Sequence, residues 1–184
     1  MFDINGLIYI PSYISQYHHD FLVNTIDQSE WRTNLKRRTQ HYGYIYDYKA
    51  KRVDASMALG PLPVWLHRIA KQLYLDGLID CVPDQAIINE YEPGQGIADH
   101  VDCEPCFGER IFSLSLCSVV VMDLKCMGQQ TPIFLEPCSL LMLSGEARHN
   151  YTHGIAARKS DTVGDVKHKR GRRLSITFRK VTLS

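Results

Sequence analysis

His100 and Asp102 lie two residues apart, and their types and spacing could bind a metal ion. On an extended strand, residues two apart point to the same side of the backbone. With one distant histidine they would form a facial triad, in which two imidazoles and one carboxylate hold Fe(II) and leave three positions open. The run His18-His19-Asp20 has the same spacing. It falls in an expected helix, where residues two apart diverge by about 200°, so we do not take it as a site.

Two arginines six residues apart near the end of the chain could bind an anion. Between Arg173 and Arg179, polar residues alternate with Leu174, Ile176 and Phe178. This alternation predicts a strand whose apolar face packs on the core. Arginines on the opposite face would line a wet cavity, and arginine binds carboxylates through two parallel hydrogen bonds. We therefore expect an anion site beside this strand.

The composition is that of one globular domain without an overall charge bias. The chain has 184 residues, of which 45% are apolar and 22% charged, and 21 basic and 20 acidic side chains give a net charge of +1. These values exclude a histone-like protein or an acidic disordered one. We expect a single domain over residues 1–184, present as a monomer. The N-terminal sequence has no basic segment and serines interrupt the longest apolar run, 111–124. We therefore expect no signal peptide, no membrane span and a cytoplasmic location, or a nuclear one in a eukaryote.

The six cysteines form no regular pattern, and a chain of this size does not need disulfides to be stable. We expect reduced thiols. Cys103 and Cys106 have the spacing of half a zinc site, which Cys126 or Cys138 could complete. A single pair at this spacing is a weak signal, so zinc is the less favoured interpretation.

Charges are segregated along the chain although their total is near zero. Residues 72–109 contain nine acidic side chains and no Lys or Arg. Residues 31–52 contain seven basic side chains against one acid, and residues 158–173 contain seven against two. Clusters of this kind can attract a charged partner even though the net charge of the whole chain is near zero. The first basic stretch could meet nucleic acid, whereas the second is either a solvated loop or part of the mouth of the site. The structural test is whether both stretches converge near His100.

Two helices precede a series of short strands. Apolar residues at helical spacing predict a helix over 14–26, capped by Ser12 or Ser15, and a second helix over 63–76, ended by Gly77. Short apolar or alternating segments bounded by Gly and Pro predict strands over 87–91, 111–124, 133–135, 140–143 and 174–181. This order indicates a mostly β fold, a sandwich or jelly roll buttressed by helices.

Four motifs in a fixed order give the sequence a family resemblance. They are Asn89-Glu90-Tyr91 with Pro93-Gly94-Gln95-Gly96-Ile97 after it, His100-Val101-Asp102, Gly145-Glu146-Ala147-Arg148 leading to Thr152-His153-Gly154-Ile155, and Arg173 to Arg179. From about residue 37 to residue 181 the chain resembles the AlkB family of Fe(II)- and 2-oxoglutarate-dependent dioxygenases. The resemblance implies a double-stranded β-helix, or jelly roll, with its core in 85–184, N-terminal helices and a nucleotide-recognition lid at 31–55.

The resemblance implies three metal ligands. His100, Asp102 and His153 would ligate Fe(II), and these are the residues that we expect to be catalytic. By spacing alone His149 competes with His153 for the third position, but the Thr-His-Gly-Ile context favours His153. Dioxygen would take part as the oxidant.

The resemblance also implies where 2-oxoglutarate, the co-substrate, would bind. Its distal carboxylate would lie against Arg173 and Tyr91, with Asn89 and Arg179 near the metal-bound end. Ser175 stands where this family commonly has an asparagine, so its contact with the co-substrate differs from the family pattern.

The expected lid combines basic and aromatic side chains. Alternate tyrosines, beginning with Tyr42 and Tyr44, would share one face of a hairpin and could stack on a flipped base. Arg37 and Arg38 would meet phosphates, which would make binding depend on salt. The alternative is a half-buried strand whose tyrosines belong to the core. Glu104 stands where base-demethylating members of the family read an exocyclic amine.

These features favour a dioxygenase that demethylates N-alkylated bases in DNA or RNA, in alkylation repair, and releases formaldehyde, succinate and CO2. Its partner would be single-stranded DNA or RNA, including transfer RNA. Three short sequences resemble more closely the branch of the family that hydroxylates a modified wobble uridine in transfer RNA. They are Tyr91 to Ile97, Ser113 to Leu116 and Thr152 to Ile155. Further alternatives are an oxygenase acting on a protein side chain and a non-catalytic module that binds nucleic acid.

Overall fold

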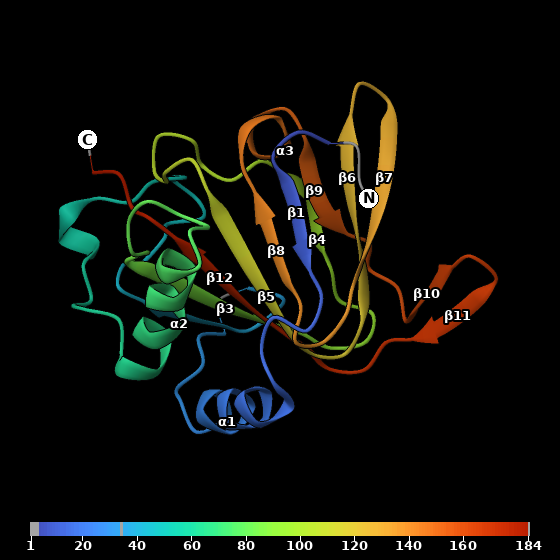
Figure 1. Cartoon of the computed structure of the whole chain (residues 1–184), viewed down its shortest axis with the longest axis horizontal. Coiled ribbons are helices and arrows are strands. Elements are labelled where there is room, and N and C mark those ends of the chain that lie inside the picture. The colour runs from blue at the N-terminus through green and yellow to red at the C-terminus, as the bar shows by residue number, and fades with distance from the viewer. Residues whose placement is uncertain (1–3, 34, 184) are drawn as a thin grey trace.

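Two antiparallel sheets face each other in the computed structural model, which describes residues 4–33 and 35–183 (Figure 1). The larger sheet has the order β1 (Leu7–Ile10), β8 (Leu140–Leu143), β5 (Ile111–Cys117), β12 (Arg173–Arg179), β3 (Gln85–Tyr91) and β2 (Thr39–Tyr42). The smaller has the order β4 (Ile97–His100), β9 (Thr152–Ile155), β6 (Val120–Cys126) and β7 (Gln129–Leu135). Strands adjacent in a sheet are mostly far apart in the sequence, which is the jelly-roll arrangement that the sequence predicted.

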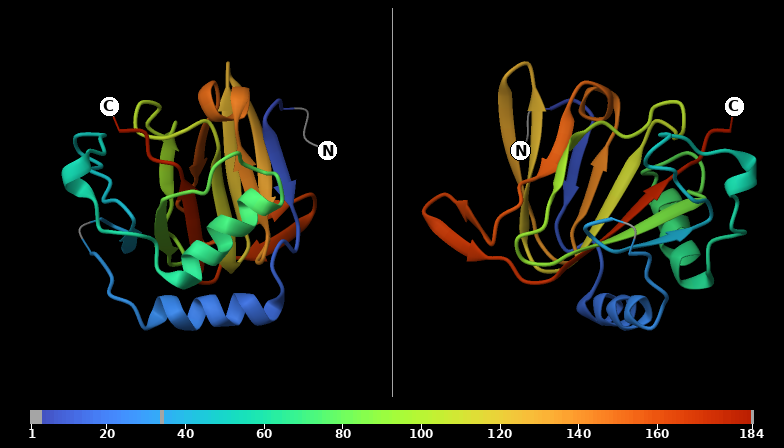
Figure 2. Two further views of the ribbon diagram at one scale, coloured as in Figure 1. Left: turned by 60° about the vertical axis from the view of Figure 1, so that its left-hand side comes forward. Right: turned by 180° about the vertical axis from the view of Figure 1, so that it is seen from behind.

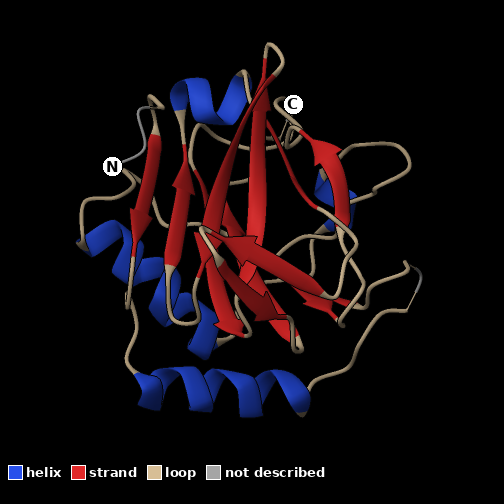
Figure 3. Cartoon of the chain, turned by 90° about the vertical axis from the view of Figure 1, so that its right-hand side faces the viewer, coloured by secondary structure: helices blue, strands red, loops and turns tan. Residues whose placement is uncertain are grey.

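Two helices cover the outer face of the larger sheet, as expected (Figures 2 and 3). Helix α1 (Gln16–Asp27) begins after Ser15, whose Oγ accepts a hydrogen bond from the backbone N–H of His18 at 3.3 Å. Helix α2 (Val64–Leu75) begins after Pro63 and ends just before Gly77, whose φ of +70° is a left-handed conformation that favours glycine. A 3-10 turn (Ala55–Met57) and the short helix α3 (Gly145–His149) complete the helical elements of the described residues.

Alternation along the strands of the larger sheet separates two environments. In β12, Leu174, Ile176 and Phe178 are fully buried against the helices. The residues between them, from Arg173 to Arg179, face the space between the sheets. The strands β3, β5 and β8 alternate in the same way, so apolar side chains fill most of the helix side of the sheet. The interior of the sandwich therefore combines a second apolar cluster, which includes Leu124, with a cavity.

The predicted strand over 111–124 is two strands. The chain reverses at Cys117, whose φ is +69°, so β5 ends there and β6 begins at Val120 in the opposite sheet. Both strands are buried, and the reversal contains neither Gly nor Pro, so periodicity and turn residues gave no sign of it. The short strands β1, β4 and β9 were also not expected.

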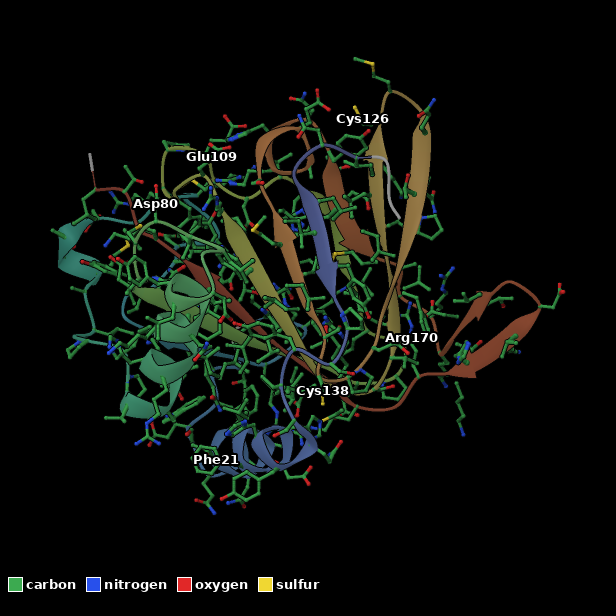
Figure 4. All side chains as sticks on the ribbon, viewed as in Figure 1. Phe21, Asp80, Glu109, Cys126, Cys138 and Arg170 are labelled. Atoms are coloured by element: carbon green, nitrogen blue, oxygen red, sulfur yellow. A yellow bond between two sulfur atoms is a disulfide. The ribbon has the colours of Figure 1, made fainter. Side chains whose placement is uncertain are left out.

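Residues 158–173 are not a simple loop but include a hairpin, β10 (Ser160–Val163) and β11 (Val166–Lys169). The hairpin projects from the end of the molecule opposite α2 (Figures 1 and 2). At its base Arg170 (Figure 4) is held by Asp161. Of this basic stretch only Arg173 lines the cavity, so the two basic stretches do not converge near His100.

Two of the six cysteines are joined, contrary to the expectation of reduced thiols. Cys103 and Cys106 form a disulfide with their Cα atoms 5.3 Å apart. Chain size shows only that a disulfide is not needed for stability, and it does not prevent two thiols three residues apart from meeting. Cys126 and Cys138 lie at opposite ends of the sandwich, so the two cannot both join one zinc site (Figure 4). Within the described residues no helix is long and apolar enough to cross a membrane.

Candidate active site

A cavity of about 500 Å³ opens between the two sheets, and most of the predicted site residues line it. They come from strands β3, β4, β9 and β12, from the loop after β4 and from the segment before β2. The predicted residues that line it are His100, Asp102, His153, Asn89, Tyr91, Arg173, Ser175, Arg179 and Arg37.

His100, Asp102 and His153 meet at one end of this cavity. The strands β4 and β9 pair so that His100 lies opposite His153, with their ring centroids 4.3 Å apart. Asp102 follows β4 directly, and its Oδ2 lies 3.9 Å from Nε2 of His153. His149 does not line the cavity, and its Nε2 contacts Oε2 of Glu109 at 3.0 Å. The geometry therefore supports His153 as the third member of the triad.

Protonation suits these three groups to a divalent cation. Burial lowers the pKa of His153 to about 4, so its imidazole is neutral at neutral pH. Burial alone would raise the pKa of Asp102, but Arg179 and the two histidines outweigh it and lower the pKa to about 2. His100 places Nδ1 2.8 Å from the carbonyl oxygen of Ala98, which leaves Nε2 free as an electron-pair donor. Two imidazoles and one carboxylate are the donors of a facial triad.

The two carboxylate oxygens of Asp102 face different neighbours. In residues 4–33 and 35–183 no group of three or more His, Cys, Asp and Glu side chains is arranged to hold a metal ion. One oxygen of Asp102, Oδ1, accepts a hydrogen bond from Arg179 at 2.6 Å. The other oxygen, Oδ2, faces His153 and is the one available to a cation.

Two buried arginines give the cavity a strongly cationic wall. Arg173 and Arg179 are 3% and 9% exposed. Nε of Arg173 and both Nε and Nη1 of Arg179 are buried without a hydrogen-bond partner in the described structure. Burial lowers the pKa of Arg173 to about 10, which leaves it cationic at neutral pH. Unpartnered buried guanidinium groups cost free energy, so these N–H groups fit an anionic ligand such as a dicarboxylate.

Arg37 reaches into the cavity from residues 35–53, which we call the lid segment. Its Nε donates to Oδ1 of Asn89 at 2.8 Å. Its guanidinium carbon lies 5.8 Å from the ring centre of Tyr48 and 5.9 Å from that of Tyr91. Arg37 therefore connects the lid segment to the expected co-substrate site rather than to the outer surface. Residue 34, inside the expected lid, lies outside the described residues.

The structure does not bring four predicted substrate residues to the cavity. Arg38 lies over Trp31 and pairs with Glu90. Tyr42 packs edge-on against Trp65 beside α2. Tyr44 and Glu104 do not line the cavity either. Glu104 instead contacts His149 at 3.2 Å.

The expectation of one tyrosine face is wrong because the alternation is broken. Gly43 has a φ of +78°, which interrupts the extended backbone after β2. Tyr46 and Tyr48 line the cavity, whereas Tyr42 belongs to the helix-covered core.

Two residues without a predicted role support the site. Ser115 of β5 accepts a hydrogen bond from Nη2 of Arg173 at 3.1 Å. The alternation of polar and apolar residues along this strand was the sequence signal that could have pointed to Ser115. Arg148 of α3 is 2% exposed and donates to the carbonyl oxygens of Asp102, Cys103, Phe107 and Gly108. An arginine in the last turn of a helix is normally solvated, so no sequence signal pointed to this role.

Comparison with known proteins places this geometry in context. The family described as the 2OG-Fe(II) oxygenase superfamily matches residues 15–179. The tRNA (carboxymethyluridine(34)-5-O)-methyltransferase ALKBH8 of Macaca fascicularis is 39% identical over 96% of this chain and 30% of that protein. A protein of Acanthamoeba polyphaga mimivirus, described as uncharacterized, is 34% identical over 97% of this chain and 86% of its own length. The solved structure of OsALKBH1 superimposes with a TM-score of 0.73 at 17% identity, covering 98% of this chain and 99% of the other. The chain spans about a third of the length of the ALKBH8 relatives that it matches.

Proposed function

The chain belongs to the AlkB family within the 2OG-Fe(II) oxygenase superfamily, and we propose that it oxidises a modified base in transfer RNA. When bound, Fe(II) with 2-oxoglutarate and O2 supplies the chemistry that inserts one oxygen atom into a substrate C–H bond and forms succinate and CO2. The observation that supports an oxygenase is the cavity wall, where buried guanidinium N–H groups without hydrogen-bond partners stand beside two histidines and an ionised aspartate.

Each group has a defined task in this proposal. His100, Asp102 and His153 would hold the metal ion through Nε2, Oδ2 and Nε2. Arg173, positioned by Ser115, would bind the distal carboxylate of 2-oxoglutarate. Arg179 would hold Asp102 in its ionised form and present its remaining N–H groups to the metal-bound end of the co-substrate. Asn89 and Tyr91 would complete that pocket, and Arg37 would seat the lid segment against it.

Two observations favour a uridine in transfer RNA over an N-alkylated adenine or cytosine. Glu104, the residue that suggested recognition of an exocyclic amine, lies outside the cavity and contacts His149. The relative with 39% identity carries a name that refers to carboxymethyluridine at position 34 of transfer RNA. The proposed reaction is therefore hydroxylation of a modified wobble uridine, with base demethylation as the competing outcome.

The test is a substrate comparison read by mass spectrometry. The chain would be incubated with Fe(II), 2-oxoglutarate and ascorbate together with either bulk transfer RNA or N-methylated single-stranded DNA and RNA. We expect a gain of one oxygen atom on a wobble uridine, with one succinate formed per modified nucleoside. Loss of a methyl group with equal release of formaldehyde would assign demethylation instead. Succinate formation without a change in any nucleoside would contradict both.

Replacing Arg173 with methionine is expected to weaken the use of 2-oxoglutarate. The change removes charged hydrogen bonds worth about 1.5–3 kcal/mol, so the KM for 2-oxoglutarate should rise about 10- to 100-fold. Lysine at this position should recover part of the loss, because it restores the charge without the second hydrogen bond. The control is Arg68→Met, at an exposed position on α2. An unchanged KM in Arg173→Met would remove this arginine from the co-substrate site.

A further inference from the structure

The loop after Asp102 connects the metal-binding end of the cavity to the lid segment. Cys103 and Cys106, which lie in this loop, are joined by a disulfide. Cys106 and Phe107 are buried in a small apolar cluster with Val53, and Tyr46 packs against that cluster. The lid segment therefore rests directly on the loop that carries the two cysteines.

Both sulfur atoms contact one carbonyl oxygen of the lid segment. Sγ of Cys103 lies 3.3 Å and Sγ of Cys106 3.4 Å from the backbone oxygen of Lys51. Lys51 itself lines the cavity and has a φ of +50°, a conformation that non-glycine residues rarely adopt. A thiol can donate a hydrogen bond to this oxygen, whereas a disulfide has no proton to donate. Reduction of the pair would therefore add hydrogen bonds between the loop and the lid segment.

The metal-binding side of the loop is fixed independently of the cysteines. Arg148 donates to the carbonyl oxygens of Asp102 at 3.0 Å and of Phe107 at 3.4 Å. Arg179 holds the carboxylate of Asp102 at 2.6 Å. Because these contacts do not involve sulfur, a change in the cysteine pair should reach Lys51 and leave Asp102 in place.

We propose that Cys103 and Cys106 are a reversible thiol–disulfide pair that sets how firmly residues 47–53 are held over the cavity. Oxidation by a small disulfide such as glutathione disulfide breaks two S–H bonds and the S–S bond of the oxidant. It forms the Cys103–Cys106 bond and two molecules of the small thiol, which take up both protons and the electron pair. Cys103 is half-buried and lines the cavity, whereas Cys106 is 4% exposed, so exchange should begin at Cys103. The effect on substrate binding rests on the proposed function, but the exchange itself does not.

Chemical trapping tests the exchange. The full chain would be equilibrated with reduced and oxidised glutathione at graded ratios, quenched with N-ethylmaleimide and mapped by mass spectrometry. We expect Cys103 and Cys106 to lose their N-ethylmaleimide adducts together in one two-electron transition, and any mixed disulfide with glutathione that is trapped during the exchange should be on Cys103. A pair that stays labelled in excess glutathione disulfide would overturn the proposal, as would zinc protection without oxidation. A pair that is reduced only after unfolding would also overturn it.

Hydrogen exchange tests the consequence without substrate or metal. In the wild-type chain, amides of residues 47–53 should exchange about 3- to 10-fold more slowly in the reduced state, as expected for one or two weak hydrogen bonds. The doubly substituted chain Cys103→Ala, Cys106→Ala should show no such difference, whereas Cys126→Ala should behave as wild type. Equal exchange in both wild-type states would overturn the link to the lid segment even if the substituted chain failed to fold.

A functional readout separates this proposal from the proposed function. The dissociation constant of a labelled transfer RNA should fall about 3- to 10-fold on reduction in wild type, while the KM for 2-oxoglutarate stays constant. A change in the KM alone would show that the pair acts on the metal-binding loop and would overturn the proposal. If no RNA binds in either state but the exchange rates differ, the proposed substrate fails and the redox pair stands.

Discussion

Replacing Asp102 with asparagine is expected to reduce succinate formation from 2-oxoglutarate more than 100-fold. In metal enzymes, removing a residue that only hydrogen-bonds to a metal ligand lowers metal affinity or activity about 10- to 100-fold. Asp102 is expected to bind the metal directly, so its loss should cost more. It is also the only carboxylate of the triad, so its loss removes the single negative charge that offsets the cation. Asparagine keeps the shape and still accepts the hydrogen bond from Arg179, which separates the loss of charge from unfolding. The measurement is succinate formed per minute with and without nucleic acid.

The chain contains its own control for this substitution. Asp20 ends the run His18-His19-Asp20, which has the same spacing but lies on α1, with a side chain 66% exposed. Asp20→Asn should keep full activity, since its position on a helix separates it from any triad. If Asp102→Asn retained more than a tenth of the wild-type rate with an unchanged melting temperature, Asp102 would not be a ligand.

Replacing Asp161 with asparagine is expected to lower the free energy of unfolding by about 3–5 kcal/mol, the usual cost of breaking a buried ion pair. Its carboxylate is 1% exposed and accepts hydrogen bonds from Arg170 at 2.6 and 2.7 Å, from Arg158 at 2.7 Å and from the backbone of Val121 at 3.1 Å. Asparagine removes the charge and leaves the buried Arg170 without its counter-ion. For a chain of this size the melting temperature should fall by roughly 6–20 °C. Thermal unfolding followed by circular dichroism measures the change.

The same carboxylate gives the stability of the wild-type chain a defined pH dependence. Burial would raise the pKa of Asp161, but hydrogen bonds from Arg170, Val121 and Arg158 outweigh it and lower the pKa. The stabilisation is therefore present above the pKa of the unfolded chain and is lost as the pH falls through the folded value. Asp161→Asn should flatten this acidic limb. Asp165→Asn, at an exposed position between β10 and β11, should leave the acidic limb unchanged. If Asp161→Asn lowered the free energy of unfolding by less than 1 kcal/mol, the buried ion pair would not have the stabilising role described above.

The sequence predicted the parts of the site that are set by local backbone geometry. The alternation from Arg173 to Arg179 defines two faces of one strand, and both arginines line the cavity as expected. His100 and Asp102 likewise needed only extended backbone. His153 could not be paired with His100 by spacing, because their opposition depends on how β4 and β9 align although 52 residues separate the two histidines. The family resemblance, and not the local pattern, selected it over His149.

What the sequence missed depends on contacts between distant segments. Arg148 is buried because the loop after Asp102 folds over it and presents backbone carbonyls, which no side-chain pattern records. The tyrosines of the lid segment were assigned to one face on the assumption of an uninterrupted strand, and Gly43 breaks it. Glu104 was placed by its distance from the metal ligands, but the loop turns it toward His149.

Correct pairing of strand β12 is needed both for the packing of the core and for the anion site. Its register against β3 and β5 sends Leu174, Ile176 and Phe178 to the helices while the arginines face inward. A shift by a single residue would invert every side chain, placing two guanidinium groups in the apolar core and three hydrocarbon side chains in the cavity. A chain with β12 shifted by one residue therefore cannot be stable and merely inactive, since the shift that removes the anion site also removes the packing of the apolar core. An insertion or deletion between Gly171 and Arg179 should therefore remove both the core packing and the anion site, whereas a change in length at the tip of the β10–β11 hairpin leaves this register as it is.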